Sequence, residues 1–449
     1  MRTWKKAISA VLALVFLTCF TTSALASDIA DWADRWDNAV SDETVLSLSP
    51  GTDETQMCFR WLSPLGAKPS FRCAKQNDLT DADSCTVQTS PTVTGQKKCT
   101  VTVNGLKRGT TYYYAYATNG VWSETFSFRT AADTLTALFV SDSQLGRSGD
   151  WRNKDVLLHD VAGWDTTLRE ATVLCPDISL CLSAGDQAEI AFAEKQYRLL
   201  LAPDVMRSLP IATTIGNHEF YFPYLNLHFA HPNRFAGSML HLLGDEPYYF
   251  TQNDVLFIVL DSNDPIAWDH EILIERAVHA HPDAKWRVVM MHHSLYSCED
   301  SFEEGPAALR DKLVPLLQKY GVDLVLSGHT HRFSRSYPLW DNTINENGIT
   351  YLEGGCCSGC NCKASPQELP EYTAAGYAKT EPVYSVLQFG ENEINIQSFA
   401  VEDGKNVQID AGTVSARPHS DEGAHSSRIV RFLQFVLSIF GRAVSLWFR

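Results

Sequence analysis

Hydrophobic and polar positions follow two different patterns along this chain. Between residues 45 and 131, apolar and polar positions alternate in short runs that are rich in β-branched and aromatic residues. Asn104-Gly105 and Asn119-Gly120 fall between such runs. Alternation that is broken by Asn-Gly pairs is typical of β-strands joined by tight turns. We therefore expect an all-β sandwich over residues 45–131.

After residue 131, continuous apolar runs of strand length alternate with stretches of helical spacing. The segments, each of which ends in polar or metal-capable residues, cover residues 135–142, 178–186, 210–217, 255–264, 286–293 and 322–329. Residues 270–281 and 308–321 have helical spacing, and the second stretch ends at a glycine. Buried strands that alternate with helices predict an α/β domain, which we place at residues 132–401. Residues 383–404 alternate again and predict closing hairpins.

The first residues have the pattern of an export signal. Arg2, Lys5 and Lys6 precede an apolar run, and a small-x-small cleavage site ends at Ala26. This order predicts a signal peptide at residues 1–26, a leader at residues 27–44, and a secreted or extracytoplasmic protein. A retained membrane anchor is the alternative, but the apolar run is short for a span of about 20 residues.

The other end of the chain predicts a basic amphipathic helix. Residues 402–427 are polar and predict a linker, whereas residues 428–449 are apolar except for one stripe. The stripe consists of Arg431, Gln434, Ser438, Arg442, Ser445 and Arg449. Such a helix fits a membrane surface or a partner protein better than open water. The charge of Arg442 disfavours a transmembrane span, and docking on the chain's own domain is the other alternative.

Composition limits the partners of the chain. With 449 residues, of which 45% are hydrophobic, the chain is long enough for two or three domains with a large core. Its net charge of −16 argues against nucleic acid as a partner. A small anionic substrate is compatible with this charge where metal ions supply local positive charge.

The chain has 12 cysteines, most of which gather in two regions. Four of them lie in the expected sandwich, and we predict that they form two disulfides of undetermined connectivity. These four are Cys58, Cys73, Cys85 and Cys99. The second region contains Cys356, Cys357, Cys360 and Cys362. Disulfides are favoured there over a thiolate metal site, because a thiolate site suits a reducing compartment better.

Metal-binding side chains follow five of the predicted strands. In chain order they are Asp142 and Gln144, Asp186 and Glu189, Asn217 and His218, His292 and His293, and His329 and His331. One such residue after a strand is common, but five strands that end in carboxylate, carboxamide or imidazole groups indicate a shared site. A pair of metal ions needs a bridging carboxylate and several further ligands, and such a pair suits phosphoryl transfer.

The order of these motifs resembles the calcineurin-like metallophosphoesterase superfamily. The matching motifs are Asp142-x-Gln144, Gly185-Asp186, Gly216-Asn217-His218-Glu219, His292 and Gly328-His329-x-His331. The β-sandwich before them is similar to a fibronectin-III-like domain, and together they resemble the purple-acid-phosphatase-like branch. The resemblance implies a metallophosphoesterase domain at residues 132–401, with two mixed sheets flanked by helices.

The resemblance also implies a role for each motif residue. Asp186 would bridge two metal ions, Asp142 and His331 would hold the first ion, and Asn217, His292 and His329 would hold the second. A metal-bound hydroxide would attack phosphorus, and His218 would protonate the leaving oxygen. Glu219 would orient His218 or its loop. His293 would either contact substrate or pack against its neighbours.

Two positions depart from the family pattern. Gln144 stands where the superfamily usually has histidine, and Glu189 stands where purple acid phosphatases have a metal-binding tyrosine. The remaining ligand of the first ion is therefore Gln144, Glu189 or water, and the ligand set allows Fe, Mn or Zn. We predict an exported phosphatase or phosphodiesterase that acts on small phosphate esters. The alternative is an inactive cell-surface binding protein that retains the fold.

Overall fold

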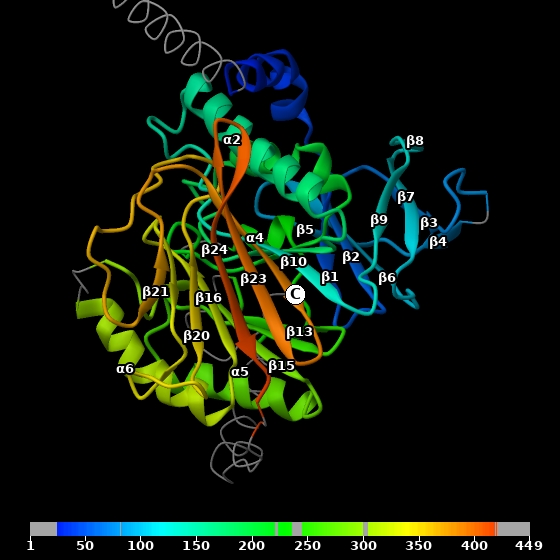
Figure 1. The fold of residues 1–449 in the computed structure, drawn as a ribbon. Helices are drawn as coiled ribbons and strands as arrows, with labels where there is room; N and C mark the ends of the chain where they lie inside the picture. Colours follow the sequence, from blue (N-terminus) through cyan, green and yellow to red (C-terminus); the bar gives the residue numbers. More distant parts are fainter. Residues whose placement is uncertain are drawn as a thin grey trace, which may run out of the picture.

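The computed structural model describes residues 25–80, 82–220, 223–235, 245–299, 304–417 and 419. A small β-sandwich lies to one side of a larger α/β unit (Figure 1). Nearly all of the expected signal peptide at residues 1–26 and the whole amphipathic helix at residues 428–449 lie outside the described residues. Within the described ranges, no helix is both long enough and apolar enough to cross a membrane.

The β-sandwich consists of two antiparallel sheets, drawn in blue and cyan in Figure 1. One sheet has the order β1 (Ser47–Pro50), β2 (Met57–Pro64), β6 (Gln96–Val103) and β5 (Gln88–Pro91). The other has the order β4 (Asp83–Cys85), β3 (Pro69–Ala74), β7 (Thr111–Thr118) and β8 (Val121–Trp122), and β9 (Phe126–Arg129) also pairs with β7. Phe59, Trp61 and Tyr114 are buried in the core of this sandwich.

The prediction of two disulfides in the sandwich is wrong, because Cys58 and Cys99 are both free thiols. They lie on the paired strands β2 and β6, with Cys58 opposite Thr102 and Cys99 opposite Trp61. Cys58 and Trp61 are an odd number of residues apart, so they point to opposite faces of the sheet. Cys99 enters the core with Trp61, whereas Cys58 faces Thr102 Oγ1 at 3.6 Å.

Two mixed sheets form the centre of the α/β unit, which confirms the predicted fold class. The six-stranded sheet has the order β12 (Ile211–Thr213), β11 (Leu180–Ser183), β10 (Leu135–Val140), β22 (Val383–Phe389), β23 (Glu393–Glu402) and β24 (Lys405–Ser415). The seven-stranded sheet has the order β13 (Tyr248–Gln252), β14 (Val255–Val259), β15 (Trp286–His293), β16 (Leu324–Gly328), β20 (Thr350–Gly354), β17 (Phe333–Ser336) and β21 (Thr373–Gly376). A small hairpin pairs β18 (Leu339–Trp340) with β19 (Thr343–Ile344).

Helices cover the outer face of each sheet and give four layers (Figure 1). The helices that follow the β-sandwich in the described chain are α2 (Lys154–Leu174), α3 (Glu194–Leu201), η1 (Asp204–Arg207), α4 (Leu225–His228), α5 (Ala267–Ala280) and α6 (Glu304–Lys319). Trp164 of α2 belongs to the core between the six-stranded sheet and its helices, and Leu317 of α6 to the core on the other side. Phe139 and Phe257 belong to a third core that joins the two sheets.

The strands that precede the predicted ligands are parallel neighbours. β10, β11 and β12 are parallel in one sheet, and β14, β15 and β16 are parallel in the other. Parallel neighbours end at the same edge of a sheet, and ligands bind beyond these carboxyl ends. The fold therefore brings the residues that follow β10, β11, β12, β15 and β16 to one edge of the molecule.

Two segments have more structure than the sequence predicted. Residues 405–415, which we expected in the linker, form the edge strand β24. Most of its side chains are exposed or half-buried, so it lacks the apolar alternation of an inner strand. Arg335 of the other sheet donates two hydrogen bonds to Asp410 of β24, at 2.6 and 2.9 Å. Residues 25–41 form a helix whose Trp32 is buried in the same core as Trp164.

Candidate metal centre

The strand ends that carry predicted ligands turn through an unusual backbone conformation. Asp142, Gln144, Asp186, His329 and His331 all have positive φ, between 33° and 78°. This left-handed region is unfavourable for residues with a Cβ, and such residues cluster at functional sites. The turns redirect the chain directly after each strand, so the side chains converge.

Glycines let these strand ends approach one another closely. A Cβ on Gly185 would lie 2.6 Å from His292 Nδ1, and a Cβ on Gly328 would lie 1.7 Å from Ser141 Oγ. Contacts this short are sterically excluded, so both positions require glycine.

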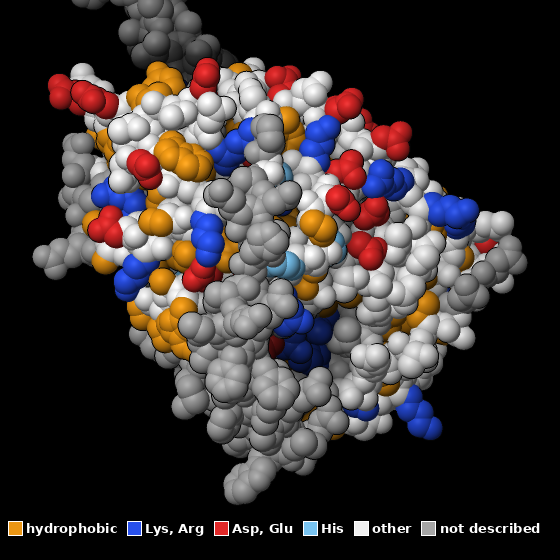
Figure 2. All heavy atoms as spheres, turned by 90° about the horizontal axis from the view of Figure 1, so that it is seen from below, with side chains coloured by type: hydrophobic (Ala, Val, Ile, Leu, Met, Phe, Trp, Pro, Cys, Tyr) orange, Lys and Arg blue, Asp and Glu red, His pale blue; other side chains and the backbone are white. Residues whose placement is uncertain are grey.

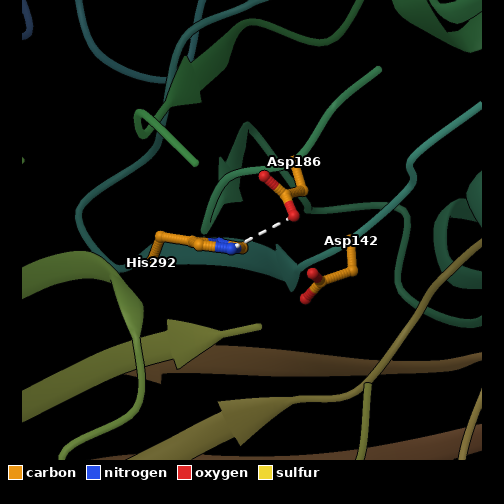
Figure 3. A group of neighbouring side chains, drawn as sticks. All are labelled: Asp142, Asp186 and His292. Atoms are coloured by element: carbon orange, nitrogen blue, oxygen red, sulfur yellow. Dashed lines mark ion pairs between the residues drawn. The ribbon is translucent and has the colours of Figure 1, made fainter. Parts of the chain in front are cut away.

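Asp142, Asp186 and His292 form the centre of the site. One ligand atom of each lies within 4.8 Å of the others, and all three side chains are buried. Figure 3 shows the two carboxylates and the imidazole gathered around one point. His292 Nδ1 donates to Ala184 O at 2.9 Å, and its Nε2 lies 3.2 Å from Asp186 Oδ2. The backbone contact leaves Nε2 as the ligand atom.

The electrostatics of this centre favour a cation. Burial disfavours the charged forms of Asp186 and His292, but their mutual attraction outweighs burial. The attraction lowers the pKa of Asp186 and raises the pKa of His292 to about 10. Burial raises the pKa of Asp142, which lies beside them. Two buried carboxylates so close together need positive charge, which a proton or a metal ion can supply.

Asn217 and His329 bring two further candidate ligand atoms to the centre. Asn217 Oδ1 lies 3.0 Å from His292 Nε2 and 2.9 Å from His329 Nδ1, and the two ring nitrogens are 3.3 Å apart. Burial, followed by the charge of His292, lowers the pKa of His329 to about 4, so its ring is neutral at pH 7. One amide oxygen and two imidazole nitrogens that meet in this way are a suitable donor set for a borderline metal ion.

Asp142, Gln144 and His331 form a second group of candidate ligand atoms. His331 Nε2 lies 3.6 Å from Asp142 Oδ1. Among the described residues, Asp142 Oδ1 and Gln144 Oε1 are buried oxygens that accept no hydrogen bond. Buried polar atoms nearly always have a partner, so two such oxygens in one site indicate a cation. The residues present therefore fit bound metal.

Glu219 supports the loops of the site. Its carboxylate accepts hydrogen bonds from four backbone N–H groups, those of Asp186, Gln187, Ala188 and Gly216, at 2.7 to 3.2 Å. Burial, followed by repulsion from Asp186, raises the pKa of Glu219, and the backbone N–H donors oppose this rise by stabilising the carboxylate. These contacts join the turn after β11 to the turn after β12, which is the supporting position expected from the sequence.

His218 lies at the wall of a cleft over the metal centre. Its Nδ1 donates to Glu189 O at 2.7 Å, and its Nε2 lies 3.9 Å from Asp186 Oδ2. The backbone contact fixes the ring and leaves Nε2 available for chemistry. The cleft has a volume of about 300 Å³, and its walls also include Gln144, Asn217 and His331.

The two remaining candidates, Glu189 and His293, make contacts of a different kind. Glu189 forms an ion pair with Arg147 at 3.2 Å, and its Oε2 lies 3.5 Å from His218 Nδ1. His293 shares a hydrogen bond of 2.8 Å with Ser262 Oγ, and its ring packs against that of His329. His293 is not among the described residues that line the cleft. Of its two expected roles, packing fits this position better.

Comparisons with known proteins agree with this geometry. The family model described as calcineurin-like phosphoesterase matches residues 135–333, and the model for the N-terminal domain of purple acid phosphatases matches residues 44–130. The chain has a calcineurin-like metallophosphoesterase domain. Its N-terminal domain places this metallophosphoesterase in the purple-acid-phosphatase-like branch.

Curated relatives of this metallophosphoesterase are similar over part of their length. Purple acid phosphatase 22 of Arabidopsis thaliana is 24% identical over 303 residues, which are 62% of this chain and 63% of that protein. Phosphoenolpyruvate phosphatase of Allium cepa is 25% identical over 236 residues, 45% of this chain and 46% of that protein. The chain thus spans less than two thirds of the length of either relative.

The metallophosphoesterase also shares its fold with solved structures. A purple acid phosphatase from yellow lupin (Lupinus luteus) seeds superposes with a TM-score of 0.63 at 16% identity, over 85% of this chain and 76% of that chain. The structure of PhoD superposes with a TM-score of 0.58 at 11% identity, over 90% of this chain and 99% of that chain. Both likenesses concern the fold alone.

The cysteine-rich segment of the metallophosphoesterase lies beside the cleft. Cys356 and Cys362 form a disulfide, as favoured from the sequence, whereas Cys357 and Cys360 are buried free thiols. Cys360 Sγ lies 3.4 Å from Ser143 O, so this segment packs against the turn that follows β10.

Sequence reasoning missed several polar residues of the metallophosphoesterase site. Arg147, Asn361 and Lys363 line the cleft. Glu353 is buried and accepts hydrogen bonds from Thr330 Oγ1 at 2.6 Å and Ser334 Oγ at 3.0 Å, which supports the turn between His329 and His331. The only sequence signal for Lys363 was that the cysteine-rich segment follows shortly after the last histidine motif.

Proposed function

We propose that this chain hydrolyses phosphate esters, with monoesters as the favoured class, at a centre of two metal ions. The observation that carries the proposal is the convergence of Asp142, Asp186 and His292 within 4.8 Å. Unpaired buried oxygens of Asp142 and Gln144, within the described part of the chain, add to it. The names of the Arabidopsis and onion relatives describe phosphatases, which supports monoesters.

Seven side chains would hold the ions. Asp186 would be shared, one ion would be bound by Asp142, Gln144 and His331, and the other by Asn217, His292 and His329. All of these donors are oxygen or nitrogen atoms, which suits Fe, Mn or Zn. When bound, the ions supply Lewis acidity that neutralises the ester's charge and makes water nucleophilic near neutral pH.

His218 would donate the proton that the leaving oxygen needs. Because Nδ1 is committed to Glu189 O, the proton would come from Nε2. The Glu189 carboxylate Oε2 lies 3.5 Å from Nδ1, on the side of the ring away from the nitrogen that would donate the proton. The backbone N–H of His218 donates to Asp186 Oδ1 at 3.0 Å, so the turn that carries the proton donor is held against the carboxylate that the ions would share.

We also propose that the protein works outside the cytoplasm. The signal-like pattern at residues 1–26 supports this, and so does the Cys356–Cys362 disulfide, because disulfides persist in oxidising compartments. Sequencing of the mature N-terminus tests the proposal, with Ser27 as the expected first residue. An uncleaved N-terminus on protein recovered from its native compartment would contradict cleavage at this site.

Metal analysis and turnover test the proposed hydrolysis. We expect about two metal ions per chain and faster turnover of a chromogenic phosphate monoester than of a diester. Asp186→Asn should reduce both metal content and turnover. His218→Ala should retain the metal and lower kcat by about 10²- to 10⁴-fold. His279→Ala, on the exposed side of α5, is the control and should behave as wild type.

Turnover of neither ester after loading with Fe, Mn or Zn would contradict the proposed function. Such a result would favour the alternative of a cell-surface binding protein that retains the fold. The ratio of monoester to diester turnover is informative in its own right, because a diester preference would assign a phosphodiesterase.

A further inference from the structure

The cleft over the metal centre has walls made of polar and charged side chains. Its lining residues are Gln144, Arg147, Asp186, Asn217, His218, Ser294, Ser297, Glu299, His329, Thr330, His331, Asn361 and Lys363. None of these described residues has an aliphatic or aromatic hydrocarbon side chain. Ligand pockets usually gain affinity from apolar and aromatic walls. This cleft therefore offers little to an apolar alcohol group, and its volume of about 300 Å³ suits a small polar one.

Some charged side chains on the cleft walls form ion pairs, and others do not. Arg147 forms an ion pair with Glu189 at 3.2 Å, and Glu299 forms one with Arg332 at 3.2 Å. Lys363 is exposed and takes part in none of the ion pairs formed within the described residues. Its ammonium group is therefore the cationic group on these walls that is not already neutralised by a carboxylate at ion-pair distance.

The backbone of Lys363 is held close to the metal centre. Its N–H donates to His331 O at 2.9 Å, so it is anchored on a candidate metal ligand. The Cys356–Cys362 disulfide closes the loop directly before it. Thr167 Oγ1 of α2 donates to Cys357 O at 2.6 Å, which ties the same loop to the protein interior. A charge presented from a fixed loop binds a ligand with less loss of conformational entropy than one on a free loop.

We propose that Lys363 binds a second anionic group, a carboxylate or a phosphate, on the alcohol part of a small phosphate monoester. The inference rests on the proposed function, since the metal centre would bind the phosphate group that is cleaved. Lys363 would then select among monoesters by the charge at the far end of the molecule.

A matched pair of substrates tests the effect of charge at the far end of the alcohol part. Glycerol 3-phosphate and 3-phosphoglycerate have the same length and differ in a CH2OH group against a carboxylate. We expect wild-type kcat/KM to be at least about tenfold higher for 3-phosphoglycerate, the effect of one charge-assisted hydrogen bond. Propane-1,3-diol bisphosphate, with a phosphate at the far end, tests whether a second phosphate is preferred to a carboxylate.

Substitutions at Lys363 test whether its side chain causes the preference for 3-phosphoglycerate. Lys363→Gln should bring the ratio of the two kcat/KM values close to one, whereas Lys363→Arg should keep most of it. Lys405→Gln removes an exposed lysine of β24 that does not line the cleft, and should leave the ratio at its wild-type value.

The outcomes separate this inference from the proposed function. The role of Lys363 would be overturned if wild-type kcat/KM were equal for glycerol 3-phosphate, 3-phosphoglycerate and propane-1,3-diol bisphosphate. The phosphatase activity itself would remain in place. A preference that survives Lys363→Gln would also overturn it. If metal-loaded wild-type protein turns over no monoester at all, the proposed function fails, and the inference fails with it.

Discussion

Gln144 and Glu189 stand at the two positions where the family resemblance leaves a metal ligand open. In the described structure, Gln144 Oε1 and Glu189 Oε2 are both buried without a hydrogen-bond partner. Glu189 Oε1 pairs with Arg147, Glu189 Oε2 lies near His218, and Gln144 lines the cleft whereas Glu189 is not among its described lining residues. A buried oxygen without a donor gains from a cation where it meets the other ligands, and Gln144 lines the cleft together with Asp186 and Asn217. We therefore favour Gln144 as the additional ligand.

Metal-loaded protein should lack the colour that a tyrosinate ligand gives to iron. Tyrosine is absent from the described residues that line the cleft, and the family resemblance implies that Glu189 stands where purple acid phosphatases have a metal-binding tyrosine. We expect no tyrosinate-to-iron charge-transfer band in the visible absorption spectrum after loading with iron. The appearance of such a band would contradict the ligand set.

Glu219→Gln should destabilise the protein although it conserves the shape of the side chain. Each carboxylate oxygen of Glu219 accepts two backbone N–H groups, so the NH2 of glutamine would face two donors in either orientation. We expect a loss of about 1–3 kcal/mol in the free energy of unfolding, measured by urea denaturation. Glu391→Gln, at an exposed position, is the control. Equal midpoints for both variants would contradict the supporting role.

The candidate ligands could be predicted from sequence because few residue types bind metal, and each of them follows an apolar strand directly. Lys363 and Glu353 could not be predicted in the same way. Their positions depend on the path of the cysteine-rich segment and of the strand β20, which are set by a disulfide and by tertiary packing rather than by local pattern.

At the scale of elements, the strands that are buried along their whole length were the ones predicted from sequence. β10, β15 and β16 are buried along their length and appear in the sequence as continuous apolar runs. β24 was missed because an edge strand needs no apolar face, and its link to the other sheet is polar, between Arg335 and Asp410. The pattern of apolar residues therefore predicts the inner strands of a sheet better than its edge strands.

Gly328→Ala should disrupt the end of β16 and the metal centre together. Its Cβ would lie 1.7 Å from Ser141 Oγ and 2.4 Å from Asp142 Oδ2, so the turn after β10 would have to move. We expect a loss of at least about 1–3 kcal/mol in the free energy of unfolding, with reduced metal content measured by elemental analysis. Gly66→Ala, whose Cβ would meet nothing within 4 Å, is the control. Normal metal content in Gly328→Ala would contradict this packing.

At the scale of the whole molecule, the candidate ligands come from both sheets. Asp142, Asp186 and Asn217 follow strands of the six-stranded sheet, whereas His292 ends β15 and His329 follows β16 of the seven-stranded sheet. Bound metal would therefore join the carboxyl ends of two sheets whose apolar faces already pack together.

Removal of metal should lower the stability of the whole α/β unit. An ion that binds the folded state stabilises it by RT ln(1 + [L]/Kd), about 4 kcal/mol at a thousandfold excess over Kd. We expect chelation to lower the Tm measured by calorimetry and metal addition to restore it. Asp186→Asn should have a lower Tm that no longer responds to metal. A Tm that is unchanged by chelation, with loss of metal verified by elemental analysis, would contradict the link between the sheets.

The C-terminal segment differs in charge from the rest of the chain. On the face shown in Figure 2, acidic and basic side chains of the described residues are interspersed rather than separated into broad fields. Residues 428–449, outside the described residues, contain four arginines and no acidic residue, in a chain with a net charge of −16. The charge of this segment is thus opposite to that of the rest of the protein.

We predict that residues 428–449 hold the protein at anionic membrane surfaces. The segment combines arginines with many large apolar side chains, so insertion of its apolar face and attraction to anionic lipid act together. Full-length protein should cosediment with vesicles that contain anionic lipid, and less so with neutral vesicles, whereas a chain that ends at residue 427 should stay in solution. High salt should weaken binding without abolishing it, because screening removes the electrostatic contribution and leaves the apolar one. Equal partitioning of both chains would show that this segment is not a membrane anchor, and would favour its docking on a protein surface.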